Sequence, residues 1–250
     1  DSLPLLLRAL KVAGLYDVAY EHRSFLDLQI EIYFKKVLNL KTKLINPESF
    51  STPKDVITRK QTCVANAFMI YLQKILLTDF PFLKNPFADM DLLTPFVEAF
   101  WVKREGFFRN DIEDDNIFVS SDANLMPYWL KVIDNDKMNK ASLDAIKREG
   151  LDSPFPLKYH SFLNPNWIHW ASRIIIPNYQ GNSIWSFFAP MYIDQLFKFY
   201  PDEAKKHLRT YMGLIEHYKT YIEVFEPRGK YLLKGRFGHS SDAGMLWAAM

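Results

Sequence analysis

Apolar residues recur at spacings of three and four along most of the chain. The pattern is clearest in residues 3–21, 25–40, 61–77, 92–101, 124–133, 183–200, 204–225 and 240–250. This period gathers apolar side chains on one face of a helix, so the sequence predicts about eight to ten helices. Alternation with a period of two is scarce, and residues 116–120 and 231–237 are the best candidates for short strands.

Long connections rich in proline and asparagine separate the predicted helices. They fall at residues 46–55, 79–91, 151–166 and 174–182. Connections of this length in a compact domain usually carry function, so we expect a site where they converge. No repeat and no boundary divides the sequence, which predicts one all-α domain over residues 1–250, built of antiparallel helix pairs.

Composition and charge limit the classes of protein to which the chain can belong. The chain is 48% apolar and 24% charged, which is typical of a globular protein with a substantial core. Its 31 basic and 29 acidic residues are spread evenly, so no basic stripe favours a nucleic-acid partner. No apolar run is long enough for a membrane span, and the lone Cys63 allows no internal disulfide. These features together predict an intracellular, cytoplasmic protein.

Aromatic residues make up 16% of the chain, and residues 179–198 concentrate them. In this segment a polar turn that contains glycine leads into Trp185 and several Phe and Tyr residues. Burial in a core would explain these rings, and so would a stacking surface for a sugar.

The acidic segment 109–116 raises the possibility of metal chemistry. Its carboxylates suggest a Mg²⁺ site of the isoprenoid-synthase kind, but the order of the acids and the lack of a second metal motif do not match that family. The histidines are dispersed and form no HxxxH pair, so no metal or other cofactor is expected. A solvated acidic loop is the simpler interpretation.

Glu223 is the carboxylate that draws most attention. It lies where a helical pattern gives way to a Pro-Arg-Gly turn, which places it at the mouth of a helical bundle, with Glu226 close by. A glutamate at a helix end is often only solvated, so its neighbours must decide its role.

Short motifs along most of the chain place Glu223 in a wider pattern. They lie in residues 56–72, 106–130, 150–161, 179–198, 221–227 and 235–246. In this order they resemble the motifs of the six-hairpin (α/α)-toroid glycosidases, and in particular the amylo-α-1,6-glucosidase domain of glycogen-debranching enzymes and its microbial relatives. Residues 179–198, for example, resemble the tract Tyr-His-Asn-Gly-Thr-Val-Trp-Pro-Trp, which lines the sugar pocket in that family.

The resemblance implies an inverting glycoside hydrolase that acts on α-glucosidic bonds without a metal. In this interpretation Glu223 matches the general base that activates water. The general acid is Asp1, which occupies the matching place before an early helix, or else Asp122, although each could simply cap its own helix. Arg59, Arg104 or Arg109 could keep nearby carboxylates ionised.

The same resemblance implies which residues contact an oligosaccharide or glucan substrate. Trp185 would form a wall of the sugar pocket, and Gln180 and Asn182 would bind hydroxyl groups. The matching motifs add further substrate-binding candidates, namely Arg109, Asp111 and Gln61.

Two departures from the family pattern leave alternatives open. Ser186 and Phe187 stand where relatives carry Pro and Trp, and Ser240 stands where the closing tract has Trp. A carbohydrate-binding toroid without activity is therefore the alternative, followed by the Mg²⁺-dependent isoprenoid-type enzyme and a helical interaction scaffold. Fewer helices are predicted than the twelve of a full toroid, and both ends look cut, so we expect an incomplete toroid within a longer protein.

Overall fold

The structure, a computed structural model, describes residues 2–47, 59–112, 117–162, 170–176, 178–231 and 234–244. Helices dominate it. They are α1 (Ser2–Val12), α2 (Tyr16–Glu21), α3 (Arg23–Val37), α4 (Cys63–Thr78), α5 (Leu93–Phe100), α6 (Ser121–Trp129), α7 (Asp136–Arg148), α8 (Trp170–Ile175), α9 (Phe188–Phe199) and α10 (Pro201–Tyr218). The short strands are β1 (Trp101–Val102), β2 (Phe107–Phe108), β3 (Ile184–Trp185) and β4 (Val224–Phe225).

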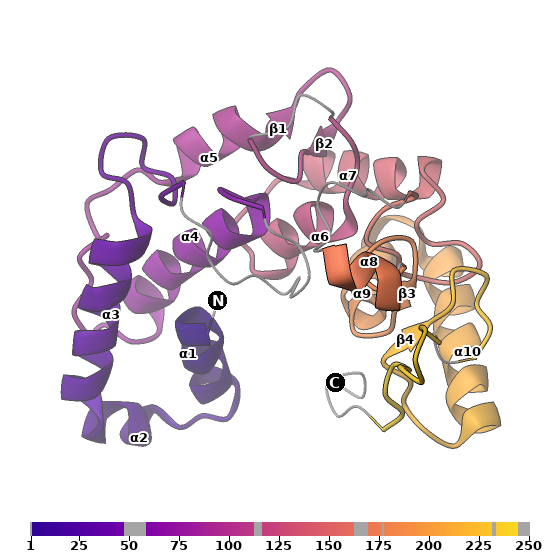
Figure 1. Cartoon of the computed structure of the whole chain (residues 1–250). Coiled ribbons are helices and arrows are strands. Elements are labelled where there is room, and N and C mark those ends of the chain that lie inside the picture. The colour runs from indigo at the N-terminus through magenta and orange to yellow at the C-terminus, as the bar shows by residue number, and fades with distance from the viewer. Residues whose placement is uncertain are drawn as a thin grey trace.

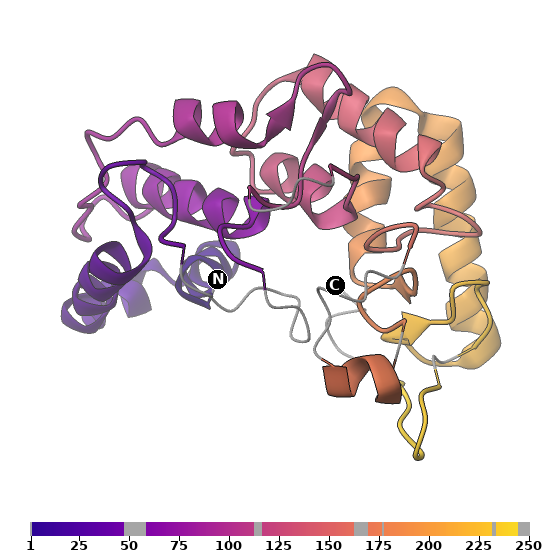
Figure 2. The same cartoon turned by 45° about the horizontal axis from the view of Figure 1, so that its top comes forward.

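The helices follow one another along an arc that runs from α3 to α10, as both views show (Figures 1 and 2). Helices α1, α4, α6 and α9 pack one against the next along this arc. Each of α4, α6 and α9 also packs against the helix that follows it in order, α5, α7 or α10, which makes a series of helical hairpins. The predicted all-α architecture of antiparallel pairs is thus confirmed.

Helix α4 shows why the series holds together. The side chain of Thr62 caps its first turn by accepting a hydrogen bond from the Ala65 N–H at 3.3 Å. The helix is apolar on nearly every side, and most of its residues are buried, because α1, α5 and α6 all pack against it.

Helix α7 is absent from the predicted helices because polar residues interrupt its apolar positions. A cap signal is nevertheless present, since the Asn135 side chain accepts a hydrogen bond from Met138 N–H at 3.1 Å. Its buried face is formed by Ser142, Leu143, Ala145 and Ile146.

Two helices are shorter than the sequence predicts. The residues left out of them form strands β3 and β4, which build the candidate site. Residues 183–200 begin as strand β3 and become helical only at Phe188, because the Trp185 N–H bonds to the Leu157 carbonyl of another segment. Residues 204–225 leave the helix at Lys219, whose left-handed backbone (φ 56°) ends α10, and continue as β4.

The two predicted strands and the predicted helix over residues 240–250 are not formed where the structure describes them. The two strand candidates contribute only single bridges where they are described, Arg109 with Val119 and Lys234 with Ser240. Residues 240–244, predicted to be helical, instead form a bridge between Ile222 and Ala243, and residues 245–250 lie outside the described part.

Candidate active site

Glu223 lies at the centre of a small patch of extended chain. It directly precedes β4, whose Val224 and Phe225 pair antiparallel with Trp185 and Ile184 of β3. On the other side of β3, Lys158 bridges to Ile184. The chain segments around residues 158, 184, 224 and 243 therefore lie in a row. Residue 158 belongs to a predicted long connection, whereas the other three segments fall in stretches that the sequence predicts to be helical.

The backbone of Glu223 is fixed from both sides. Its N–H donates to the Asp242 carbonyl at 3.0 Å. Its carbonyl accepts hydrogen bonds from both the N–H and the hydroxyl of Ser186, each at 3.1 Å. The side chain thus starts from a rigid point on the irregular sheet, rather than from the helix end that the sequence suggested.

The Glu223 carboxylate is held by neutral donors. The Tyr179 hydroxyl donates to Oε1 at 3.0 Å, and the backbone N–H of Asp242 donates to Oε2 at 3.2 Å. The residue is 7% exposed, so it does not point into bulk solvent. Hydrogen bonds that end on a carboxylate favour its ionised form, and each oxygen has a second lone pair beyond the bond it accepts here.

Trp185 lies against Tyr179. The two ring centroids are 4.8 Å apart with an edge-to-face inclination of 65°, and the indole Nε1–H donates to the Tyr179 carbonyl at 2.5 Å. Tyr159 and Phe187 contact other edges of the indole, and Trp185 is only 1% exposed. The structure therefore shows Trp185 as the support beneath Tyr179, and its contact with a sugar stays a prediction.

The polar residues between Tyr179 and β3 are also buried or half-buried. Gln180 is fully buried, whereas Asn182 is half-buried. The Asn182 Oδ1 and the Ser183 hydroxyl have no hydrogen-bond partner among the residues that the structure describes. Asn182 and Gln180 remain predicted substrate contacts, and Asn182 lies within the turn that leads from Tyr179 to Trp185.

Asp122 occupies the first turn of α6 and is 4% exposed. The preceding Ser121 N–H donates to the Tyr159 carbonyl at 2.8 Å, and the Tyr159 ring lies 5.5 Å from that of Trp185 between centroids. A short run of contacts thus connects the start of α6 to the support beneath Tyr179. The other candidate acid, Asp1, lies outside the described residues.

A second buried carboxylate, that of Asp111, forms a different kind of cluster. Arg59 binds it with two nitrogens of its guanidinium: Nε donates to Oδ2 at 2.8 Å and Nη2 donates to Oδ1. The Asn110 side-chain amide also donates to Oδ2, at 2.7 Å. The Arg59 and Asp111 side chains are 13% and 1% exposed, so this is a buried ion pair.

Of the other predicted substrate contacts, Arg109 contacts this pair, whereas Gln61 bonds to a different segment. Arg109 Nε donates to the backbone carbonyl of Asp111, and the Gln61 side chain donates to the Ile45 carbonyl at 2.8 Å. The Ser120 hydroxyl donates to Asn110 at 3.2 Å, so the start of α6 touches this cluster as well. The structure therefore brings Arg109 and Asp111 together and connects both carboxylate clusters to the α6 N-terminus, where Asp122 lies.

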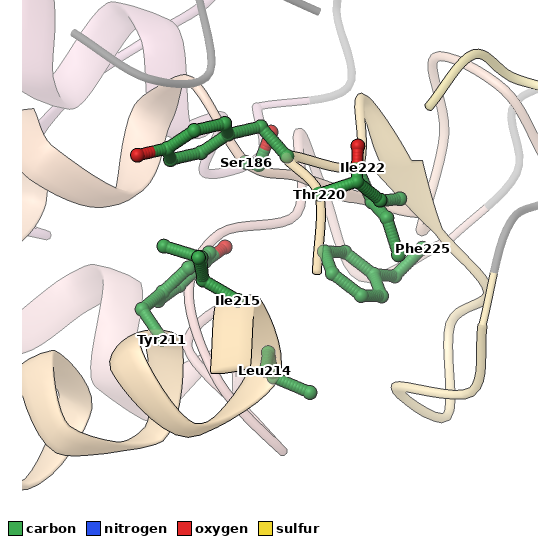
Figure 3. Close-up of a pocket in the computed structure, with 8 residues that line it drawn as sticks. Ser186, Tyr211, Leu214, Ile215, Thr220, Ile222 and Phe225 are labelled. Atoms are coloured by element: carbon green, nitrogen blue, oxygen red, sulfur yellow. The ribbon is translucent and has the colours of Figure 1, made fainter. Parts of the chain in front are cut away.

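The reverse side of β4 is apolar. Figure 3 shows a small hollow between α10 and residues 220–225, lined in part by Tyr211, Leu214 and Ile222. Two of its polar groups are already engaged, because the Ser186 hydroxyl bonds to the Glu223 carbonyl and the Tyr211 hydroxyl bonds to the Pro156 carbonyl. Burial raises the pKa of Tyr211, which keeps this phenol a neutral donor. The hollow therefore belongs to the packing that supports Glu223 from behind.

Tyr179 and Asp242 are the contributors that sequence reasoning missed. Tyr179 begins the tract that resembles the sugar-pocket motif, so its position was available as a signal. Asp242 acts through its backbone N–H, which every residue except proline possesses, so its residue type carries no signal.

No group of three or more His, Cys, Asp or Glu side chains in the described ranges is arranged to hold a metal ion. None of the described helices combines the length and apolar character needed to cross a bilayer.

Comparison with known structures assigns the class of fold. The arc of hairpins has the (α/α)-toroid fold, and it is incomplete. A rhamnosidase from Klebsiella oxytoca with rhamnose bound matches 96% of this chain with a TM-score of 0.63 and 14% identity. The GH63 mannosylglycerate hydrolase from Thermus thermophilus, in complex with Tris and D-glycerate, matches 76% of it with a TM-score of 0.50 and 16% identity.

These likenesses concern the fold, since the identities are low. The chain spans 42% of the rhamnosidase chain and 44% of the mannosylglycerate hydrolase chain, so it corresponds to less than half of either. No protein-family model matches the sequence, and no curated protein matches it.

Proposed function

We propose that this chain carries the water-activating half of an inverting glycoside hydrolase, with Glu223 as the general base. The observation that carries the proposal is the Glu223 carboxylate, buried and held by two neutral donors, in a fold shared with glycosidases. Because each carboxylate oxygen accepts one hydrogen bond from a neutral donor, each retains a lone pair that can accept a proton from water.

The reaction also needs an acid on the opposite side of the sugar. In an inverting enzyme, one carboxylic acid protonates the leaving oxygen while a carboxylate roughly 6.5–9.5 Å away deprotonates the attacking water. Asp122 is a candidate for the acid role because it is buried, and because Ser121 and Tyr159 connect the start of α6 to the support beneath Tyr179. Asp1 is the second candidate for this role.

The proposed substrate is an α-glucoside in an oligosaccharide or a branched glucan, as the motif resemblance to debranching enzymes implies. The structural neighbours extend the panel worth testing, since one is named a rhamnosidase and the other a mannosylglycerate hydrolase. Asn182 is a further candidate contact, because its Oδ1 has no hydrogen-bond partner among the residues that the structure describes and could accept one from a sugar hydroxyl.

The experiment measures sugar release from maltose, isomaltose, trehalose, glycogen limit dextrin, an aryl α-rhamnoside and mannosylglycerate. We expect hydrolysis of at least one α-glucoside, with proton NMR showing an inverted anomer as the first product. Glu223→Gln should lower kcat by roughly 10²- to 10⁴-fold, the usual contribution of a general base. Glu226→Gln, three residues further along, is the matched control and should retain activity.

Two results would contradict the proposal. Full activity of Glu223→Gln would remove the general base from this position. Sugar binding by calorimetry without any hydrolysis would instead favour the carbohydrate-binding toroid.

A further inference from the structure

Tyr179 contacts both Glu223 and Trp185 in the candidate site. Its hydroxyl donates to the Glu223 Oε1 at 3.0 Å, and its backbone carbonyl accepts the Trp185 indole N–H at 2.5 Å. Its ring meets the indole edge-to-face. Tyr179 is therefore held at its backbone and at its ring, while its one polar side-chain atom is directed at the carboxylate.

We infer that Tyr179 is a positioning residue that orients the Glu223 carboxylate, with Trp185 as the anchor of Tyr179. The inference rests on the proposed role of Glu223 as general base. It goes beyond the family resemblance, which gives the tract around Trp185 the role of a sugar-pocket wall and assigns no role to Tyr179.

The hydrogen-bond geometry supports this role. One donor on each oxygen fixes the rotation of the carboxylate about its terminal bond, so the remaining lone pairs point in defined directions. The Asp242 donor belongs to the backbone, so no change of side chain other than to proline removes it. The Tyr179 hydroxyl is the side-chain donor on Glu223 among the described contacts, and so it is the donor that a substitution can remove.

The dependence of this hydrogen bond on the charge of its acceptor also supports a positioning role for Tyr179. A phenol hydroxyl donates more strongly to a carboxylate than to a protonated carboxyl group, so the contact stabilises the form that can accept a proton. Losing the donor should make Glu223 easier to protonate. Activity that depends on ionised Glu223 should then fail at a higher pH than in the parent protein.

Tyr179→Phe removes the hydroxyl and keeps the ring that packs against Trp185. The chain offers a matched control in Tyr192 of α9, whose hydroxyl donates to the Asp152 carboxylate at 3.0 Å. Burial raises the pKa of Tyr192, so it too is a neutral donor to a carboxylate. Tyr192→Phe thus makes the same chemical change at a tyrosine–carboxylate pair that has no role in the proposed reaction.

The test compares pH–rate profiles of the parent chain, Tyr179→Phe and Tyr192→Phe on the best substrate. For Tyr179→Phe we expect kcat to fall roughly 10- to 100-fold, the equivalent of a hydrogen bond to a charged group, with KM nearly unchanged. Its acid limb should move to higher pH. Tyr192→Phe should match the parent in both respects.

A second measurement keeps the inference testable where hydrolysis or folding fails. With ¹³C-labelled glutamate, the Glu223 carboxyl signal, assigned through its loss in Glu223→Gln, should titrate at higher pH in Tyr179→Phe. Incorporating 3-fluorotyrosine at position 179 keeps the hydroxyl and strengthens it as a donor, so it should move the titration to lower pH.

The outcomes separate this inference from the proposed function. If Glu223→Gln is inactive while Tyr179→Phe keeps the parent profile and titration, the positioning role is wrong and the general base stands. If the parent hydrolyses nothing but the carboxyl titration shifts as expected, the contact is real and the proposed function fails.

Discussion

Asp111 and Glu223 are both buried carboxylates on extended chain, and they differ in what holds them. Asp111 is bound by a positive guanidinium that spans both of its oxygens, with an amide beside it. Glu223 is bound by a phenol and a backbone N–H, both of which are neutral. The two carboxylates are therefore similarly buried but lie in different electrostatic environments.

The difference decides what each carboxylate can do. A carboxylate in a two-pronged ion pair with arginine is strongly stabilised as an anion, and accepting a proton would strand the buried positive charge. This makes Asp111 a structural tie between the loop before α4 and the strand-like segment after β2. Glu223 strands no charge on protonation, so it can cycle between its two forms as a general base must.

Removing the Asp111 carboxylate should give the largest loss of stability. Asp111→Ala leaves Arg59 charged and largely buried without its partner, and we expect the free energy of unfolding to fall by about 3–5 kcal/mol. Urea denaturation followed by circular dichroism measures it. Glu105→Ala, which removes a carboxylate from an exposed turn, is the control and should leave the unfolding midpoint unchanged. A loss below about 1 kcal/mol for Asp111→Ala would mean that the ion pair is not a structural tie.

Glu223→Gln should have a smaller effect in the same assay. The amide keeps one acceptor oxygen, loses the other, and leaves no charged partner behind, so we expect a loss of about 1–2 kcal/mol. We therefore expect Asp111→Ala to cause the larger loss of stability and Glu223→Gln to cause the larger loss of activity. A loss for Glu223→Gln that equals the loss for Asp111→Ala would erase the distinction between the two sites.

The smallest effect should come from Asp79, which pairs with Lys11 at 2.9 Å where α1 meets the end of α4. Burial would raise the pKa of Asp79, but hydrogen bonds from Thr78 and Lys11 outweigh it and hold the pKa below its ordinary value. A carboxylate with a lowered pKa stabilises the fold above its unfolded pKa of about 4 and loses this contribution as the pH falls through its folded value.

We therefore expect Asp79→Asn to cost less than about 1 kcal/mol at pH 7. The difference from the parent should shrink as the pH falls below about 4. Denaturant titrations at pH 7 and at progressively lower pH check this. A difference that stays constant with pH would show that the pair contributes through packing rather than through charge.

The helical architecture could be predicted from the sequence because it depends on local periodicity. The apolar run of α4 predicts a helix that is buried on several sides, and the structure places neighbours on those sides. By contrast, α7 was missed because its apolar residues are few, although Asn135 in the capping position was a usable signal.

The candidate site was predicted only in outline, because its contacts join distant parts of the chain. Arg59 is one of three arginines that the sequence suggests could lie near carboxylates, but its pairing with Asp111, 52 positions away, depends on the path of the chain. The same holds for Tyr179 and Glu223, which are 44 positions apart. Strands β3 and β4 have only two residues each, too few for any alternation to be recognised.

The row of four segments around Glu223 has a consequence for how the protein folds during its synthesis. Each segment is contributed by a different stretch of chain, and the Asp242 amide lies far along the sequence from the first of them. On the ribosome, the early hairpins can pack as they emerge, whereas the carboxylate acquires its second donor only after residue 242 has left the exit tunnel. A nascent chain can thus be folded over most of its length before the Glu223 carboxylate has both of the hydrogen bonds that hold it for its proposed role.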